Sequence, residues 1–167
     1  MSVPAQASDH GYSRVSVTHF GSRLYTEGRK GPAGAADDTW IIHLGRVLDK
    51  AIYTRLAGGF FFSARILDVD LAGEVIGGKR VYSKDTPPWM KIEYTLRDAS
   101  GATLEGGQIE LTDHNYLTRK LDVRKEPMAY ERAMIEQWLN GLLGPVAPPP
   151  AYKEGDSPWE RAQWWAY

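Results

Sequence analysis

Two segments of the chain repeat apolar residues at the spacing of an amphipathic helix. The first runs from Trp40 to Leu56, follows the N-cap candidates Asp37-Asp38-Thr39 and ends at Gly58-Gly59. The second opens at Pro127 and ends at Asn140-Gly141. Its apolar stripe consists of Tyr130, Met134, Ile135, Trp138 and Leu139. Each helix should lay this face on a common core and turn its charged residues to solvent.

Four further segments alternate apolar and polar residues with the period of two that is typical of strands. They are residues 14–20, 60–76, 89–97 and 102–112. Asp98-Ala99-Ser100-Gly101 predicts a hairpin turn between the last two, and Gly106-Gly107 predicts a bulge in the return strand. Residues 79–82 can add a short ladder. Residues 21–36 are rich in Gly, Pro and charge without periodicity, which predicts an exposed loop.

The long strand predicted over residues 60–76 changes phase partway along. Up to Ile66 its apolar residues occupy even positions, whereas in Leu67-Asp68-Val69-Asp70-Leu71 they occupy odd positions. A β-bulge near Ile66 would resolve this conflict, because one extra residue re-aims every side chain after it. Asp68 and Asp70 would then share one face of the strand, while the apolar residues of the run stay buried on the other.

Together these elements predict one α+β domain over residues 14–141 in the order β-α-β-β-β-α. We expect an antiparallel sheet of about four strands with two helices on one face. We expect residues 1–13 to be a flexible leader, which can be the remnant of a signal-peptide cleavage region, and residues 142–167 to be a Pro-rich linker and an aromatic tail. One compact domain with an appendage suits a chain of 167 residues with 43% hydrophobic content.

Composition removes several classes of function. The 20 basic and 21 acidic residues are interspersed, so no basic field would attract nucleic acid. The absence of cysteine excludes disulfides, thiolate metal sites and cysteine nucleophiles. No apolar run approaches the ~20 residues of a transmembrane helix. His10, His19, His43 and His114 lie in separate elements, and no Gly-rich loop opens a helix, so neither a zinc site nor a nucleotide cofactor is expected.

The candidate acidic surface consists of Asp68, Asp70, Glu74 and Asp113. Alternate strand positions put two carboxylates on one face, where they can supply oxygens to a hard cation, but the spacing of a calcium loop is missing. A carboxylate pair can also act as general acid and base, as in glycoside hydrolysis, with Tyr94 or Tyr116 beside it. Alternatively the acids pair with Arg65, Arg97 or backbone amides, or cap a helix. We favour the structural role and assign no catalytic residue and no metal ligand.

The tail carries five large aromatic residues that are candidates for binding a protein partner: Tyr152, Trp159, Trp164, Trp165 and Tyr167. Tryptophan and tyrosine dominate binding hot spots, and an extended tail can wrap a partner. Alternatively the tail folds back and covers the open face of its own sheet.

Several sequence blocks follow one another over residues 14–140. They are Leu67 to Glu74, Pro87-Pro88, Tyr94-Thr95-Leu96, Leu111-Thr112-Asp113 with Asn115-Tyr116-Leu117, and Tyr130-Glu131-Arg132 with Met134 and Trp138. In this order they resemble the uncharacterised bacterial family catalogued as domain of unknown function 3016. The resemblance implies a small secreted protein, usually periplasmic, and implies no activity. Ala5-Gln6-Ala7 has the small-x-small form of a signal-peptidase site, which agrees with export.

The hypothesis for function is a non-enzymatic periplasmic accessory or interaction protein. It would be a subunit of a cell-envelope or membrane-bound assembly and would dock through its aromatic tail and its sheet edge. The alternative is a hydrolase, or a metal- or carbohydrate-binding protein, that uses the carboxylates of Asp68, Asp70, Glu74 and Asp113.

Overall fold

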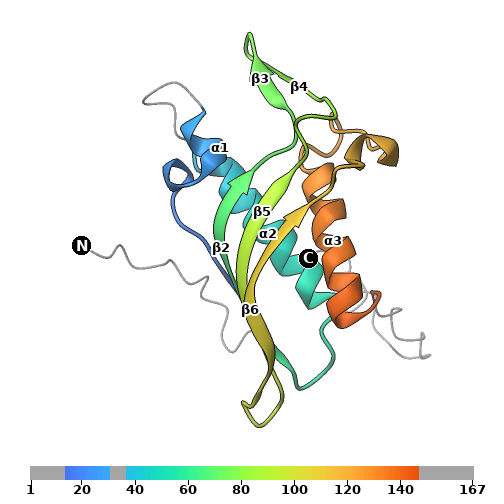
Figure 1. The fold of residues 1–167 in the computed structure, drawn as a ribbon. Coiled ribbons are helices and arrows are strands. Elements are labelled where there is room, and N and C mark those ends of the chain that lie inside the picture. Colours follow the sequence, from blue (N-terminus) through green and yellow to red (C-terminus); the bar gives the residue numbers. More distant parts are fainter. Residues whose placement is uncertain (1–13, 31–36, 147–167) are drawn as a thin grey trace, which may run out of the picture.

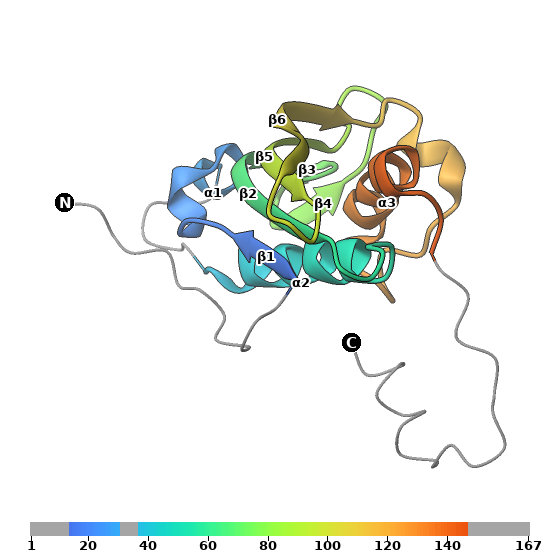
Figure 2. The same cartoon turned by 90° about the horizontal axis from the view of Figure 1, so that it is seen from below.

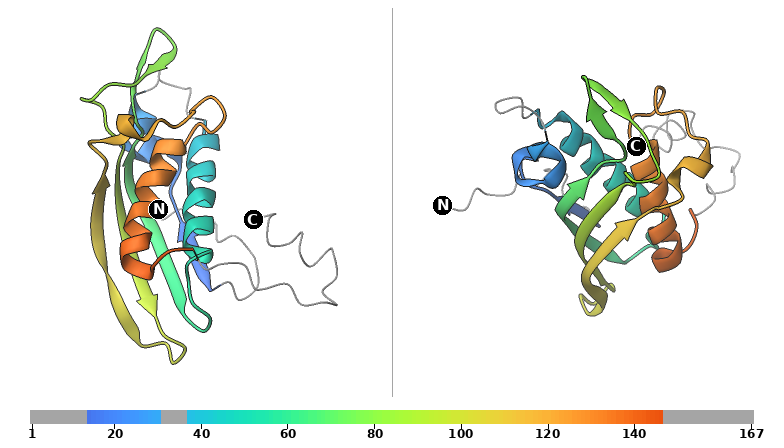
Figure 3. Two further views of the ribbon diagram at one scale, coloured as in Figure 1. Left: turned by 90° about the vertical axis from the view of Figure 1, so that its right-hand side faces the viewer. Right: turned by 45° about the horizontal axis from the view of Figure 1, so that its top comes forward.

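The centre of the protein is a four-stranded sheet with both long helices on one side (Figure 3). The computed structural model describes residues 14–30 and 37–146. The strands, in spatial order, are β1 (Val15–Thr18), β2 (Phe61–Asp70), β5 (Trp89–Arg97) and β6 (Thr103–Thr112). The helices are α2 (Thr39–Tyr53) and α3 (Ala129–Leu143). The predicted α+β class and the order of these six main elements are confirmed.

The core lies between the sheet and the two helices, as the alternation along each strand predicts. Figure 2 shows α2 against β1 at one edge and α3 toward the side of β6. Inward side chains of the strands include Phe62, Ala64, Ile66, Val69, Met90, Ile92 and Leu111, and those of the helices include Ile41, Leu44, Leu48, Ile52, Met134, Ile135 and Leu139. Burial of this apolar surface is the main stabilising contribution to the fold.

One strand pair corrects the prediction of a wholly antiparallel sheet. β1 runs parallel to β2, with Val15 opposite Phe62 and Thr18 opposite Arg65. The chain between these strands forms α2, and a helical crossover returns it to the end of the sheet from which it started. The other two pairs, β2 with β5 and β5 with β6, are antiparallel.

The phase change in β2 is a β-bulge, as predicted. The register with β5 shifts between Ile66 and Asp68, so Leu67 is the extra residue. Beyond the bulge Val69 is fully buried, and Asp68 and Asp70 face away from α2 and α3. The expected burial of Leu67 is wrong, because the bulged residue has no cross-strand partner and stays half-exposed.

The strand does not continue to residue 76. It ends at Asp70, and the following residues form a separate hairpin of β3 (Glu74–Ile76) and β4 (Lys79–Val81), which projects from one end of the molecule (Figure 1). Gly73 makes this break with a φ of +81°. A Cβ atom there would lie 2.8 Å from the carbonyl oxygen of Val81, so the turn requires glycine.

Part of the predicted exposed loop after β1 is ordered and buried. It contains the short helices η1 (Ser22–Leu24) and α1 (Thr26–Arg29). Tyr25 between them is fully buried, accepts a hydrogen bond from the Phe20 amide (2.7 Å) and donates one to the Ile66 carbonyl (3.1 Å). The prediction was wrong because a single buried tyrosine leaves no periodic pattern.

One predicted bulge and two predicted helix ends also differ from the structure. The predicted bulge at Gly106-Gly107 is wrong: the register of β5 with β6 shifts at Leu104, and Gly106 is needed because a Cβ would lie 2.9 Å from the Tyr94 carbonyl oxygen. α3 passes the predicted cap at Asn140-Gly141 and ends before Gly144, which has a φ of +89°. α2 ends at Tyr53, before the predicted glycine pair.

A last short helix, η2 (Tyr116–Arg119), follows β6. In the part of the chain that the structure describes, no helix has the length and apolar content required to cross a membrane.

Candidate functional site

The acidic end of β2 is tied to α1 by its first aspartate. The Thr26 amide donates a hydrogen bond to one Asp68 carboxylate oxygen (2.7 Å), and the Thr26 hydroxyl donates to the other (2.8 Å). Thr26 is the first residue of α1, so Asp68 satisfies an amide that the helix itself leaves without an acceptor. This is the helix-capping role that the sequence left open for these acids.

Two other carboxylates, which the sequence analysis did not select, hold the backbone that follows. Glu27 of α1 accepts a hydrogen bond from the Leu71 amide (3.1 Å), and Glu131 of α3 accepts one from the Ala72 amide (2.7 Å). Both glutamates are buried. They satisfy amides that would otherwise be desolvated without an acceptor, which is costly.

Arg80 closes this arrangement from the projecting hairpin. Its guanidinium forms an ion pair with Glu27 and donates to the carbonyl oxygens of Ala72 (3.0 Å) and Gly73 (3.3 Å). The break after β2 is therefore fixed by α1, α3 and β4 together. A signal for Glu27 and Glu131 was absent from local sequence patterns, because their partners lie 44 and 59 residues away along the chain.

The surroundings of these acids move their pKa values in opposite directions. Burial opposes ionisation of Asp68, but the hydrogen bonds from Thr26 and from the Val69 amide outweigh it and lower the pKa of the carboxyl. Burial raises the pKa of the Glu131 carboxyl, and the Ala72 amide and Arg80 offset this only in part. The environment of Asp68 thus favours its charged form, whereas the environment of Glu131 disfavours the charged form of that side chain.

Beside this structural cluster lies an open cleft at the end of the sheet face that the helices leave uncovered. We call it the Trp89 cleft; its volume is about 360 Å³. Its lining residues are Lys30, Asp70, Leu71, Gly73, Asp85, Thr86, Pro87, Trp89, Thr112 and His114. Asp70, Trp89 and Thr112 are register partners on three adjacent strands, so they form one row across the sheet. Lys30 forms an ion pair with Asp70 at one end of the row.

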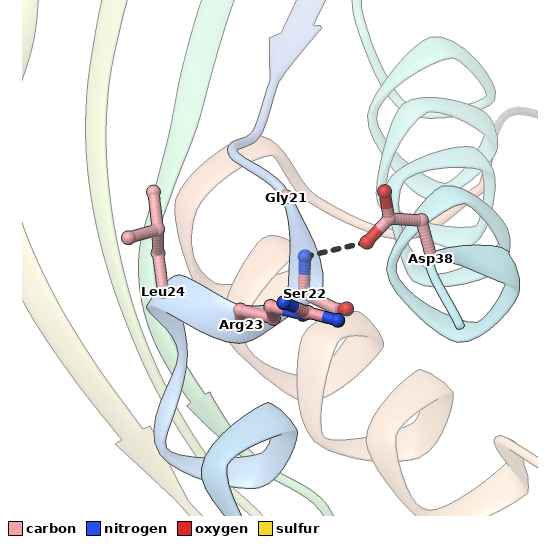
Figure 4. A pocket seen from close by; sticks show the side chains of 5 residues that line it. All are labelled: Gly21, Ser22, Arg23, Leu24 and Asp38. Carbon is pink, nitrogen blue, oxygen red and sulfur yellow. Dashed lines mark hydrogen bonds between the residues drawn. The ribbon is translucent and has the colours of Figure 1, made fainter. Parts of the chain in front are cut away.

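A second hollow, of about 290 Å³, lies beside η1 (Figure 4). The Ser22 amide donates to a carboxylate oxygen of Asp38 across it (2.8 Å), and the Ser22 hydroxyl is buried with no hydrogen-bond partner among the described residues. Gly21, Arg23 and Leu24 complete its lining. This hollow is lined by one carboxylate and no aromatic side chain, so the Trp89 cleft is the stronger candidate.

The structure separates the four acids of the predicted acidic surface. Asp70 lines the Trp89 cleft, Asp68 is occupied by α1, and Glu74 is exposed at the start of β3. Asp113 is buried and accepts hydrogen bonds from Arg119 Nε (2.5 Å) and the Asn115 amide (3.1 Å). Over residues 14–30 and 37–146, no group of three or more His, Cys, Asp or Glu side chains is arranged to hold a metal ion.

The tyrosines considered as stacking groups lie elsewhere. Tyr116 is fully buried and donates to the Ser83 carbonyl (2.7 Å), and Tyr94 is buried and donates to Glu105 (3.0 Å). The aromatic residue at the cleft is instead Trp89, which alternation had placed only in a strand. The predicted partner-binding residues Tyr152, Trp159, Trp164, Trp165 and Tyr167 lie outside the described residues.

Comparison with known proteins gives a family match and distant structural likenesses. Residues 13–141 match the profile of the family described as protein of unknown function (DUF3016). No curated protein matches the chain. Among solved structures, the chain is similar to PelC in a dodecamer from Paraburkholderia phytofirmans, with 11% identity, a TM-score of 0.40 and coverage of 87% of this chain and 100% of that one. It is also similar to a minor lipoprotein from Acinetobacter baumannii, with 12% identity, a TM-score of 0.29 and coverage of 70% and 92%.

Proposed function

Since this chain belongs to the DUF3016 family of proteins of unknown function, we propose a function from its own surface. The protein is a non-enzymatic interaction protein of the bacterial cell envelope, which docks on a protein partner through the open face of its sheet and its aromatic tail. Export to the periplasm is supported by the family resemblance and by the Ala5-Gln6-Ala7 triplet.

The observation that carries this proposal is the charged lattice on the open sheet face. Arg65 of β2 and Glu93 of β5 form an ion pair of 2.7 Å across two strands. Lys91 of β5 has Asp68 and Glu110 as its register partners on the two neighbouring strands. In the described chain, α2 and α3 lie on the other side of the sheet (Figure 3), and α1 reaches this face at Asp68. Opposite charges on neighbouring strands stabilise one another, and their pattern offers a partner a surface of complementary charge.

The bonding of the acids also favours interaction over catalysis. Asp68 and Asp113 are each bonded by groups of their own chain: Thr26 and the Val69 amide for the first, and Arg119 with Asn115 for the second. A general acid or base must reach the substrate within hydrogen-bond distance. Carboxylates that instead hold a helix start and a loop serve the fold, which leaves the ordered face as the surface for function.

The tail supplies the second contact. Residues 147–167 contain the five aromatic residues named above as partner-binding candidates, and aromatic anchors dominate the energy of protein interfaces. The exposed edge of β6 adds a third element, because in the described chain this ten-residue strand is paired on one side only.

Site-specific photo-crosslinking in the native bacterium tests the proposal. A photoreactive residue replaces Lys91 on the open face or, as the matched control, the exposed Arg46 on the outer side of α2. We expect a discrete adduct with one envelope protein from position 91, none from position 46, and a weaker adduct when residues 147–167 are deleted. No adduct at position 91, or the same adducts from both positions, contradicts the proposal.

A further inference from the structure

The floor of the Trp89 cleft includes the indole of Trp89, which offers a flat surface for a ligand. Met90 is fully buried toward the helices, so its neighbour Trp89 points to the open face of the sheet. Asp70 and Thr112 occupy the same row on either side of it. Directly opposite side chains start about 5 Å apart at their Cβ atoms. The indole is thus flanked by a carboxylate on one side and a hydroxyl on the other.

The walls of the cleft are held in place without a ligand. The Gly73 amide donates to the Thr86 carbonyl (2.9 Å), which joins the break after β2 to the turn before β5. Asp70 pairs with Lys30 at the edge of the cleft, where both side chains are partly exposed. Pro87 adds a restricted backbone beside them. A site that is ordered in advance loses little entropy on binding, and a volume of about 360 Å³ falls within the range of small-molecule sites.

The polar groups of the cleft indicate the class of ligand. Asp85 and Asp70 are acceptors, Lys30 is a donor, and Thr112 and His114 can act as either. The two carboxylates repel an anionic ligand, and Lys30 neutralises Asp70, which leaves a cationic ligand only the exposed carboxylate of Asp85. Leu71, Pro87 and Trp89 give the cleft an apolar part, but a lipid chain would take water from the charged groups beside it without bonding to them. A neutral ring with hydroxyls at its edge and C–H groups on its face matches both the polar rim and the indole.

We propose that the Trp89 cleft binds a neutral carbohydrate, with a sugar ring stacked on Trp89 and its hydroxyls bonded to Asp85 and the neighbouring polar side chains. This ligand site goes beyond docking on a protein, and neither depends on the other. Trp89 acts as a platform because its large apolar face stays at the surface of the sheet while its row partners supply hydrogen bonds.

The test is a microarray of neutral and charged oligosaccharides probed with the full chain, followed by solution titration of the best neutral ligand. We expect binding to neutral glycans and at least about tenfold weaker affinity for Trp89→Ala. Asp85→Asn is the second variant, because Asp85 is exposed and its replacement should weaken binding with the fold intact. Tyr53→Ala, an exposed aromatic on α2, is the matched control and should bind as the wild type does.

Three outcomes would overturn the proposal. The wild type binds no neutral glycan at millimolar concentration, it binds charged glycans or amines alone, or both cleft variants bind as tightly as the control. Because Lys91 is outside the cleft, loss of the protein adduct at that position with intact glycan binding would refute the docking proposal and leave the carbohydrate site standing.

Discussion

Replacement of the buried Glu27 by alanine should destabilise the protein more than replacement of Asp70, a partly exposed acid at the end of β2. The Glu27 side chain is only 8% exposed, and its carboxylate lies 3.9 Å from Lys30 Nζ in addition to two closer partners. It accepts the Leu71 amide (3.1 Å) and pairs with Arg80. The matched control is Asp70→Ala, since Asp70 also pairs with a cation, Lys30, but with side chains that are 32% and 40% exposed.

The magnitude follows from what each change leaves behind. Glu27→Ala leaves the Leu71 amide without this acceptor in a part-buried position, which costs roughly 1–3 kcal/mol. Arg80 loses its carboxylate but keeps two carbonyl acceptors and some contact with water, so about 1 kcal/mol more is expected. The total is about 2–4 kcal/mol. For Asp70→Ala the exposed pair predicts a loss of roughly 0–1 kcal/mol.

Urea unfolding followed by tryptophan fluorescence measures both values. A loss of about 3 kcal/mol would be a large part of the roughly 5–15 kcal/mol that stabilises a typical domain, with little change in the slope of the transition. A loss below about 1 kcal/mol for Glu27→Ala, or a loss no larger than that of Asp70→Ala, would refute the assignment of Glu27 as the structural support of this loop.

Two further predictions concern the same loop. The folded pKa of Glu131 is raised above its unfolded value, so its contribution to stability is complete below the unfolded pKa and is lost as the pH rises toward the folded one. The stability of the wild type relative to Glu131→Gln should therefore fall as the pH is raised above the ordinary pKa of a glutamate in urea titrations. A difference independent of pH would contradict the buried, proton-binding role. Gly73→Ala should lower the free energy of unfolding by at least about 2 kcal/mol, because it combines a positive φ with a clash at the Val81 carbonyl. Gly77→Ala, the control, has a positive φ in open space and should lower it by about 1 kcal/mol. Equal urea midpoints for the two variants would exclude the clash as the cause.

The main elements were predictable because each has a local cause. The alternation of β5 around Met90 and Ile92 and the turn at Asp98–Gly101 can be recognised within a window of a few residues. The bulge at Leu67 was predictable for the same reason, since a change of phase is visible along one strand. These features follow from the periodicity of apolar residues along the chain, so no knowledge of tertiary contacts was needed to predict them.

The candidate site was less predictable because its parts meet through space. The sequence identified Asp70, but its row with Trp89 and Thr112 requires the strand register. Asp113 was expected at an acidic surface, whereas the structure buries it against Arg119. The identity of a side chain does not reveal its distant partner, so the same carboxylate is compatible with catalysis, metal binding or support of the backbone.

The sequence by itself determined the class of the fold, the order of its main elements and the acidic run as a mark of the family, because these depend on residue spacing along the chain. Only the tertiary structure decided how the run is used. Glu27 and Glu131 are of a residue type that usually faces solvent, but here they are buried and accept hydrogen bonds from the amides of Leu71 and Ala72. The reason is energetic: a buried amide needs an acceptor, and the fold supplies it from whichever element lies closest in space.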